Sequence, residues 1–210
     1  MSELSTALAN LEEERVRILV QQRVNGGNEP LSIVNELRQG MDIVGERYKS
    51  KEYFLSELII SGEIFKEAMA LVEPLLKAGK RGEPLGRMVL GTVKGDIHNI
   101  GKDIVATLLT AAGFEVYDLG VDVPPSKFIE KLMETNASIL GMSGLLTPAF
   151  ESMKETVKAV AEAGLRHGIK VIIGGGIVTE AVGRYVGADA FTDDAAEGVE
   201  ICKKFVGALN

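Results

Sequence analysis

The sequence predicts an α/β protein in two parts: a helical domain over residues 1–78 and a flavodoxin-like (Rossmann-like) domain over residues 87–210. Three observations lead to this fold class. Before residue 78, apolar side chains recur at helical spacing. After residue 87, short apolar runs alternate with helical segments, which is typical of a parallel sheet covered by helices on both faces. The stretch Lys77–Gly86, rich in glycine and charge, separates the two patterns and predicts a linker.

The helical part predicts four helices with short connections, which favours a small bundle. They cover residues 8–25, 28–37, 41–48 and 54–76. The first ends at Asn25-Gly-Gly27. The second begins with Asn28 as N-cap and has Pro30 in its first turn, both preferred residues at a helix start.

The second part predicts five strands, at residues 87–92, 115–119, 138–143, 170–174 and 189–192. A helix over Ile100–Ala112 follows the first strand, and a last helix covers Ala195–Leu209. In a flavodoxin-like sheet, the order in which successive strands are added reverses between the first and third strands, and ligands bind at the carboxyl ends of these two strands. His98 follows the first of these strands, and Ser143 ends the third.

Charge and composition argue against nucleic-acid binding, a membrane span and secretion. The formal net charge of −7 argues against nucleic acid, which needs clustered Lys and Arg. No apolar run approaches the roughly 18 residues of a membrane span, and the acidic N-terminus does not resemble a signal peptide. The single Cys202 cannot form an internal disulfide, and its place in an apolar-periodic helix predicts a buried thiol. We therefore expect a cytoplasmic protein without a membrane partner.

The run Gly91–Gly101 carries the strongest chemical signal. It places His98 on a loop after a strand, with Asp96 two residues earlier. An imidazole there can bind a metal through one ring nitrogen while the carboxylate holds the other. Gly95 and Gly101 lack a Cβ, which would allow a large planar ligand to approach the backbone. The alternative is that the histidine helps to cap the following helix.

Two later segments also end strands with small residues. In Gly141–Ala149, Ser143 and Thr147 have hydroxyls that can donate hydrogen bonds into a groove. In Lys170–Gly176, the strand ends in glycines, including Gly174 and Gly175. Each segment alone is equally consistent with an ordinary strand-to-helix turn.

Asp-x-His-x-x-Gly, with both later segments at the expected spacing, resembles the cobalamin-binding region of methionine synthase and of small corrinoid methyl-carrier proteins. The resemblance implies base-off/His-on binding, in which His98 ligates cobalt and the displaced dimethylbenzimidazole tail enters a slot. It implies cofactor forms such as methylcobalamin, cob(I)alamin and hydroxocobalamin. The cofactor contacts that it implies are Gly95, Asp96, Ile97, His98, Asn99, Ile100, Gly101, Ser143, Leu145, Thr147, Gly174, Gly175, Phe191 and Ala195.

The helical part resembles the cap that covers the upper face of the corrin in this family. The segments that carry this likeness are residues 41–48 and 53–58. By this match Tyr48 and Leu55 shield the methyl group, although both could simply pack the bundle, and Leu58 is expected to do so.

The chain departs from the family at Ala149 and at the pair Asn99 and Asp103. Ala149 stands where methionine synthase has a serine that bonds to the aspartate, so that hydrogen bond is absent. Asn99 and Asp103 stand where many relatives carry Asp and Asn. The effect of the alanine on histidine ligation is left open by the sequence.

The resemblance implies a methyl carrier with no catalytic residue of its own. Its implied partners are a substrate-specific methyltransferase, a second methyltransferase that serves tetrahydrofolate or coenzyme M, and a reductive activase. The donor stays open among methanol, a methylamine, betaine and an aryl ether, as does the oligomeric state. A cobalamin-dependent sensor and the small subunit of an adenosylcobalamin mutase are the alternatives. His167, predicted at a helix C-terminus, has no expected role.

Overall fold

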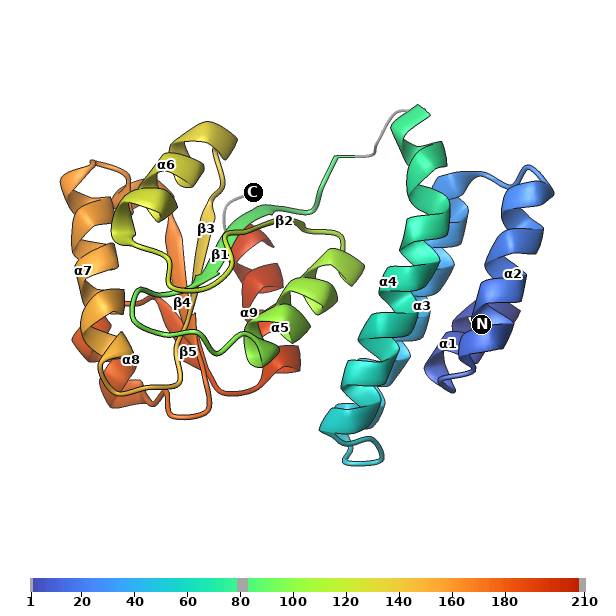
Figure 1. Ribbon diagram of the computed structural model, residues 1–210, viewed down its shortest axis with the longest axis horizontal. Coiled ribbons are helices and arrows are strands. Elements are labelled where there is room, and N and C mark those ends of the chain that lie inside the picture. Colours follow the sequence, from blue (N-terminus) through green and yellow to red (C-terminus); the bar gives the residue numbers. More distant parts are fainter. Residues whose placement is uncertain (1, 79–82, 208–210) are drawn as a thin grey trace. The chain divides into compact units, whose positions relative to one another are not determined.

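The computed structural model describes residues 2–78 and 83–207, which fold as two units, Met1–Glu83 and Pro84–Asn210 (Figure 1). Residues 79–82 of the predicted linker and residues 208–209 of the predicted last helix lie outside the described part. No described helix is long and apolar enough to cross a membrane.

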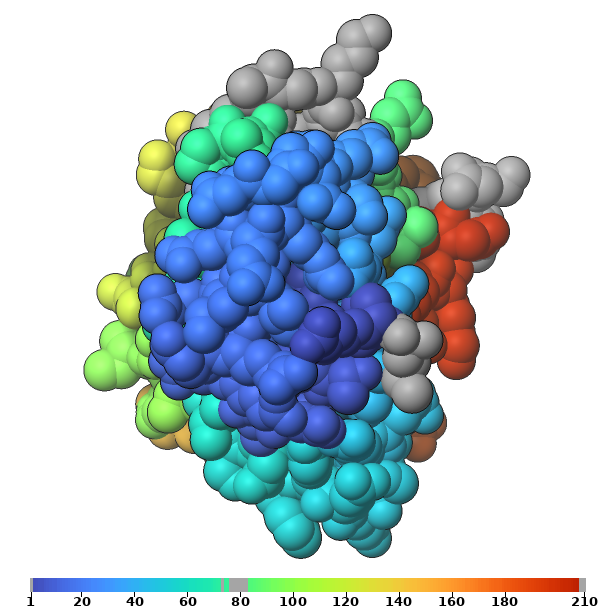
Figure 2. All heavy atoms as spheres, turned by 90° about the vertical axis from the view of Figure 1, so that its right-hand side faces the viewer, coloured from blue at the N-terminus to red at the C-terminus, as the bar shows by residue number. Residues whose placement is uncertain are grey.

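The first unit is the predicted bundle of four helices. They are α1 (Glu3–Ala9), α2 (Glu13–Asn25), α3 (Pro30–Lys49) and α4 (Leu55–Ala78). Figure 2 shows the face of this unit on which α1 and α2 lie. The core is built from the apolar stripes of all four helices: Leu4, Leu8, Val16, Val20, Ile33, Leu37, Val44, Leu58, Phe65 and Val72.

Three predicted helix boundaries in this unit are wrong. The first predicted helix is two helices, because Leu11 takes a left-handed conformation (φ 61°) and its N–H bonds to the Leu8 carbonyl. The second and third predicted helices are the single helix α3, whose N-cap is Glu29 and not Asn28. Gly40 lies inside α3, where a Cβ would lie 2.9 Å from a carbonyl oxygen of α1.

The second unit is the predicted five-stranded parallel sheet, with strand order β2-β1-β3-β4-β5. The strands are β1 (Arg87–Thr92), β2 (Glu115–Asp118), β3 (Ile139–Ser143), β4 (Lys170–Gly174) and β5 (Ala190–Thr192). The helices are α5 (Ile100–Ala111), α6 (Pro125–Thr135), α7 (Ala149–Glu162), α8 (Glu180–Val186) and α9 (Ala195–Gly207). This is the flavodoxin-like order, and the fold prediction is confirmed.

The helices cover both faces of the sheet, with α5 and α9 packed together on one face and α6, α7 and α8 on the other (Figure 1). On the second face the core includes Phe128, Leu132, Met142, Met153, Val160 and Ile173. The register pairs Thr92 with Ser143, so β1 and β3 end side by side. The loops after these two strands therefore meet at the switch point of the sheet.

His167 does not end an α-helix, as the sequence had predicted. Helix α7 ends at Glu162, and the left-handed glycine after it is Gly164 (φ 74°). His167 lies in a separate 3₁₀ turn, Arg166–Gly168, where it is exposed.

Candidate functional site

His98 is held by the carboxylate that precedes it. Asp96 Oδ1 accepts a hydrogen bond from the backbone N–H of His98 at 2.9 Å and lies 2.7 Å from its ring Nδ1. The Asp96 side chain is fully buried, whereas 48% of the His98 side chain is exposed. Asp96 thus fixes the imidazole through Nδ1, which leaves Nε2 as the ring nitrogen that can bind a ligand.

The second oxygen of Asp96 binds the loop after β3. Asp96 Oδ2 accepts from the backbone N–H groups of Leu145 at 2.7 Å and Leu146 at 3.1 Å. Burial alone would raise the pKa of Asp96, but the hydrogen bonds from His98, Leu145 and Leu146 outweigh it and lower the pKa to about 2. An ionised carboxylate only accepts hydrogen bonds, so in the neutral imidazole the proton lies on His98 Nδ1 and the lone pair on Nε2.

These contacts do not form a helix cap. Helix α5 begins after Asn99, and no side chain caps its N-terminus. Asp96 instead joins two loops, because Oδ1 binds His98 within the β1–α5 loop and Oδ2 binds Leu145 in the β3–α7 loop. The alternative interpretation of the Asp96–His98 pair as a cap is therefore wrong.

The rest of the β1–α5 loop is also tightly held. The buried hydroxyl of Thr92 donates to the His98 carbonyl at 3.0 Å. Gly95 has φ 84°, a conformation that favours glycine, and its N–H donates to Asp122 Oδ1 at 2.7 Å. An added Cβ at Gly95 or Gly101 would meet open space. Gly95 is thus needed for the turn, and Gly101 leaves the surface beside His98 uncovered.

Exposed apolar side chains lie on the three loops that meet near His98 and at the start of α5. They are Ile97 (72% exposed), Ile100 (67%), Val121 (39%), Leu145 (40%) and Leu146 (43%). They come from the loops after β1, β2 and β3 and from the first residue of α5, which meet at the carboxyl edge of the sheet. An exposed apolar surface of this kind beside one imidazole fits a large flat ligand with a central metal.

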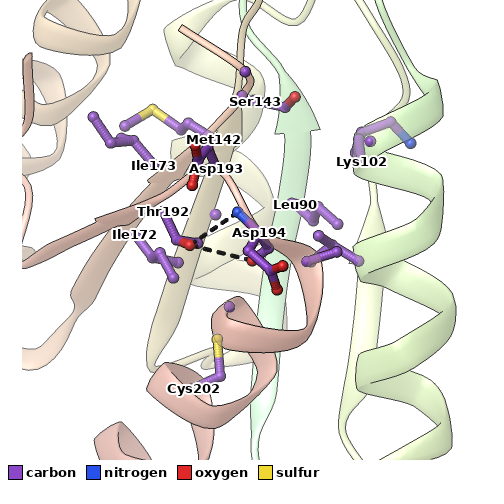
Figure 3. Close-up of a pocket in the computed structure, with 18 of the residues that line it drawn as sticks. Leu90, Lys102, Met142, Ser143, Ile172, Ile173, Thr192, Asp193, Asp194 and Cys202 are labelled. Carbon is purple, nitrogen blue, oxygen red and sulfur yellow. Dashed lines mark hydrogen bonds between the residues drawn. The ribbon is translucent and has the colours of Figure 1, made fainter. Parts of the chain in front are cut away.

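A cavity of about 130 Å³ lies between the sheet and helices α5 and α9 (Figure 3). Its inner wall is apolar and contains Met88, Leu90, Val105, Ile172 and Cys202. Four glycines from β3, the end of β4 and α9 also line it: Gly141, Gly174, Gly175 and Gly198. Figure 3 shows Ser143 at one end and Cys202 at the other. The volume is close to the roughly 150 Å³ that holds one benzene ring, so an aromatic group fits.

Part of the cavity lining is polar. Thr192 Oγ1 accepts from the Asp194 N–H at 3.0 Å and lies 3.2 Å from the Asp194 carbonyl oxygen (Figure 3). Thr192 also bonds to Glu197 Oε2 at 2.5 Å, and Asp193, Asp194 and Ala195 line the cavity with it. The cavity therefore suits a ligand part with an aromatic body and a polar connection to solvent.

The structure brings most of the predicted tail residues together. Ser143, Gly174, Gly175 and Ala195 line the cavity. Leu145 and Thr147 lie exposed on the β3–α7 loop, outside the lining of this cavity. Phe191 is also outside it: its ring packs against α8, close to Gly183.

The predicted cap residues lie at one end of the helical unit. Tyr48 is in the last turn of α3 and is half-buried, and Leu55 opens α4 and is 52% exposed. Leu58 is only 1% exposed and packs in the bundle, as expected.

Sequence reasoning missed several residues that hold the site. Lys102 is buried and binds Asp103 and Asp118, both at 2.5 Å. Burial opposes its charge, but these two carboxylates outweigh burial and raise the pKa of Lys102. Asp122 binds the His98 loop, and Cys202 forms part of the cavity wall. The one available signal was Asp118 near the end of the predicted strand 115–119 and Asp122 in the turn that follows it.

Comparison with known proteins gives concordant matches. A model of the B12 binding domain matches residues 86–203, and a second B12 binding domain model matches residues 2–73. The dimethylamine corrinoid protein of Methanosarcina barkeri is 37% identical over 207 residues, which are 98% of this chain and 97% of that protein. The crystal structure of a cobalamin-binding protein from Desulfitobacterium hafniense DCB-2 matches with a TM-score of 0.76 at 43% identity, covering 96% of both chains. A chain of the methanol:cobalamin methyltransferase complex MtaBC from Methanosarcina barkeri matches with a TM-score of 0.85 at 26% identity, covering 97% of this chain and 78% of that one.

Proposed function

This chain belongs to the B12-binding family of corrinoid proteins, and we propose that it carries a methyl group on the cobalt of a bound corrinoid between two methyltransferases. Family membership confirms the resemblance predicted from the sequence. The carrier role rests on the proteins that the chain resembles, which include a dimethylamine corrinoid protein and a methanol:cobalamin methyltransferase complex.

The geometry of His98 is the observation that carries the proposal. Asp96 fixes the Nδ1–H tautomer, which leaves the Nε2 lone pair as a ligand for cobalt in base-off/His-on binding. The corrin would lie on the apolar surface around His98, in contact with Gly95, Ile97, Asn99, Ile100 and Gly101. Bound cobalt supplies the chemistry, since it accepts and releases the methyl group. The chain supplies orientation, and we assign it no catalytic residue.

The cavity beside α9 is the proposed slot for the displaced dimethylbenzimidazole tail. The volume and the apolar wall of this cavity suit one aromatic group. Ser143 and Ala195 are among the residues that line it. Leu145 and Thr147 would contact the tail near the surface. Phe191 packs on α8, and we leave it out of the slot.

The helical unit is the proposed cap. We assign residues 1–78 to this cap and residues 87–210 to cobalamin binding. Tyr48 and Leu55 lie at the end of the unit where α3 leads into α4, and the exposed Leu55 has no core role that would compete with shielding a methyl group.

The proposed partners are a substrate-specific methyltransferase, a second methyltransferase that uses tetrahydrofolate or coenzyme M, and a reductive activase. The methyl donor stays open, because its recognition would belong to the first methyltransferase. We propose that the protein acts in the cytoplasm, where its lone thiol stays reduced.

Reconstitution with hydroxocobalamin tests the proposal. The wild-type protein should bind one corrinoid, and after reduction to cob(II)alamin its electron paramagnetic resonance spectrum should show coupling to a histidine nitrogen. Uniform ¹⁵N labelling of the protein should change that coupling, which identifies the protein as the source of the nitrogen. His98→Ala should abolish the effect of the label.

His167→Ala is the matched control, because His167 is the other histidine of the chain and is exposed on the 3₁₀ turn. It should behave as the wild type does. Reduction to Co(I) followed by methyl iodide should then give a methylated protein that transfers its methyl group to a partner methyltransferase. A coupling that is insensitive to the protein label would mean that dimethylbenzimidazole stays on cobalt, and the proposal would be wrong.

A further inference from the structure

We propose that Asp122 is a positioning residue that holds the His98 loop in the conformation required for cobalt ligation. The inference rests on the proposed function, since it concerns the same imidazole. It assigns a role to the loop after β2, residues 119–123, which lies between Asp118 and helix α6.

Asp122 makes a two-point contact with the residues just before His98. Its carboxylate Oδ1 accepts from the Gly95 N–H at 2.7 Å, and its own N–H donates to the Asp96 carbonyl at 2.9 Å. Both contacts span 26 or 27 positions of sequence. They fix the peptide that carries the Asp96 side chain, and Asp96 in turn fixes the His98 ring.

The backbone at Asp122 takes a left-handed conformation, with φ 53°. Aspartate is among the few L-residues that adopt this conformation readily, so the residue type suits the backbone here. The two contacts with Gly95 and Asp96 fix the residue in this conformation. Asp122 is exposed, so packing of its side chain in a core does not explain the conformation.

The same loop is also tied to the chain after His98. Asp118, which ends β2, accepts from the Gly120 N–H at 2.8 Å and binds the buried Lys102 at 2.5 Å. Lys102 lies in the first turn of α5, four residues after His98. The β2–α6 loop therefore holds the His98 loop on both sides, through Gly95 and Asp96 before it and through Lys102 after it.

Such a double attachment sets the position of the imidazole before a ligand arrives. A ligand that binds a preorganised group does not have to order it, and outer contacts of metal ligands typically affect metal affinity 10–100-fold. Loss of the Asp122 contact should therefore weaken His98 ligation while the overall fold persists, because Asp118 and Lys102 still hold the loop.

Three substitutions separate the contact from the backbone conformation. Asp122→Gly keeps the left-handed conformation at low cost but removes the acceptor. Asp122→Asn keeps both, because an asparagine oxygen can accept from Gly95 and asparagine tolerates positive φ. Asp122→Ala loses both. The matched control is Asn136→Ala, which removes another left-handed residue (φ 51°) at the end of α6, remote from the His98 loop in sequence and contacts.

The readout is the ratio of His-on to His-off protein loaded with cob(II)alamin, from its nitrogen coupling. Asp122→Gly and Asp122→Ala should lower this ratio by about 10-fold or more. Asp122→Asn should restore at least half of the wild-type ratio. In the protein without cofactor, amide hydrogen exchange at Gly95 should be faster in Asp122→Gly than in the wild type. Asn136→Ala should change neither quantity, whatever its effect on melting temperature.

The outcomes distinguish this inference from the proposed function. A wild-type protein without histidine coupling overturns the proposed function and this inference with it. A wild-type His-on spectrum together with an unchanged ratio in Asp122→Gly overturns only the positioning role. A loss in Asp122→Gly that asparagine does not rescue would also overturn it, because the acceptor would then not be the cause.

Discussion

In the proposed His-on complex, replacing Asp96 by asparagine should weaken histidine ligation by inverting the tautomer of His98. The carboxylate receives four N–H groups: two from His98 on Oδ1, and those of Leu145 and Leu146 on Oδ2. An asparagine has one oxygen and one NH₂ group, so one of these two sides must face a donor.

The asparagine NH₂ group should face the side of the site with fewer donors that cannot change role. If the NH₂ group faced Leu145 and Leu146, two backbone N–H groups would oppose it, and neither can change its role. If it faced His98, only the backbone N–H would be opposed, because ring Nδ1 can become an acceptor by moving its proton to Nε2. The second arrangement is favoured, and it protonates the nitrogen that would bind cobalt.

Two free-energy changes follow from this arrangement. Loss of the charged acceptor for one buried N–H, and weaker bonds for the others, should lower the free energy of unfolding by about 3 kcal/mol. At 2–4 °C per kcal/mol, the melting temperature should fall by about 6–12 °C. Ligation through Nε2 would also require breaking the new hydrogen bond between the asparagine NH₂ group and the His98 ring, at about 1–3 kcal/mol, which corresponds to a His-on ratio about 5–150-fold lower.

The assay is the His-on ratio of cob(II)alamin-loaded protein, compared with Asp96→Ala and with Asp42→Asn as a control on exposed α3 surface. Alanine leaves both tautomers accessible, so the ratio should rank wild type, then Asp96→Ala, then Asp96→Asn. Asp42→Asn should match the wild type. An asparagine variant that ligates better than the alanine variant would refute the tautomer argument.

Three further substitutions or modifications test the rest of the site. Gly175→Ala should destabilise the second unit by at least about 2 kcal/mol, because φ at Gly175 is 140° and a Cβ would clash with the Gly144 carbonyl oxygen. In the control Gly176→Ala, the Cβ meets only a side chain, at 3.6 Å, so thermal unfolding should show a smaller loss of stability. Gly198→Leu should fill the cavity, so isothermal titration should show lost affinity for cobalamin but retained affinity for tailless cobinamide, whereas Gly207→Leu on open α9 surface should bind both. Burial raises the pKa of Cys202 to about 12, so iodoacetamide should label it at pH 8 only after unfolding. Because the raised pKa belongs to the folded state, the stability that the neutral thiol contributes is present below about pH 8.5 and is lost as the pH rises toward 12; labelling of the folded protein at pH 8 would contradict this.

The central strands β1, β3 and β4 were predictable from the sequence because they are largely buried. Such strands appear as continuous apolar runs, and the helices between them have their own period. The helical unit was less predictable at its breaks. Leu11 turns the chain without a glycine or proline, and Gly40 lies inside a helix because α1 packs closely against it. Both features depend on tertiary packing, which local pattern does not contain.

The core of the site was predictable for a different reason. Asp96 and His98 are two residues apart, so their hydrogen bond is local and their types already indicate the chemistry. The contact between Asp122 and Gly95 spans 27 residues, and that between Lys102 and Asp118 spans 16. The amides of Leu145 and Leu146 are backbone groups, so their role does not depend on residue type and leaves no mark in the sequence.

Those two amides also account for the alanine at position 149. The sequence suggested that Asp96 would lack a partner there, since a serine hydroxyl is missing. In the structure the buried Ala149 lies beside the β3–α7 turn, and Asp96 Oδ2 already accepts two N–H groups from that turn. A carboxylate oxygen offers about two lone-pair sites, so its capacity is filled. These two main-chain donors help to keep Asp96 ionised without a hydroxyl at position 149. Because a backbone N–H does not titrate in the physiological range, His98 is held through a carboxylate whose second oxygen has fixed donors.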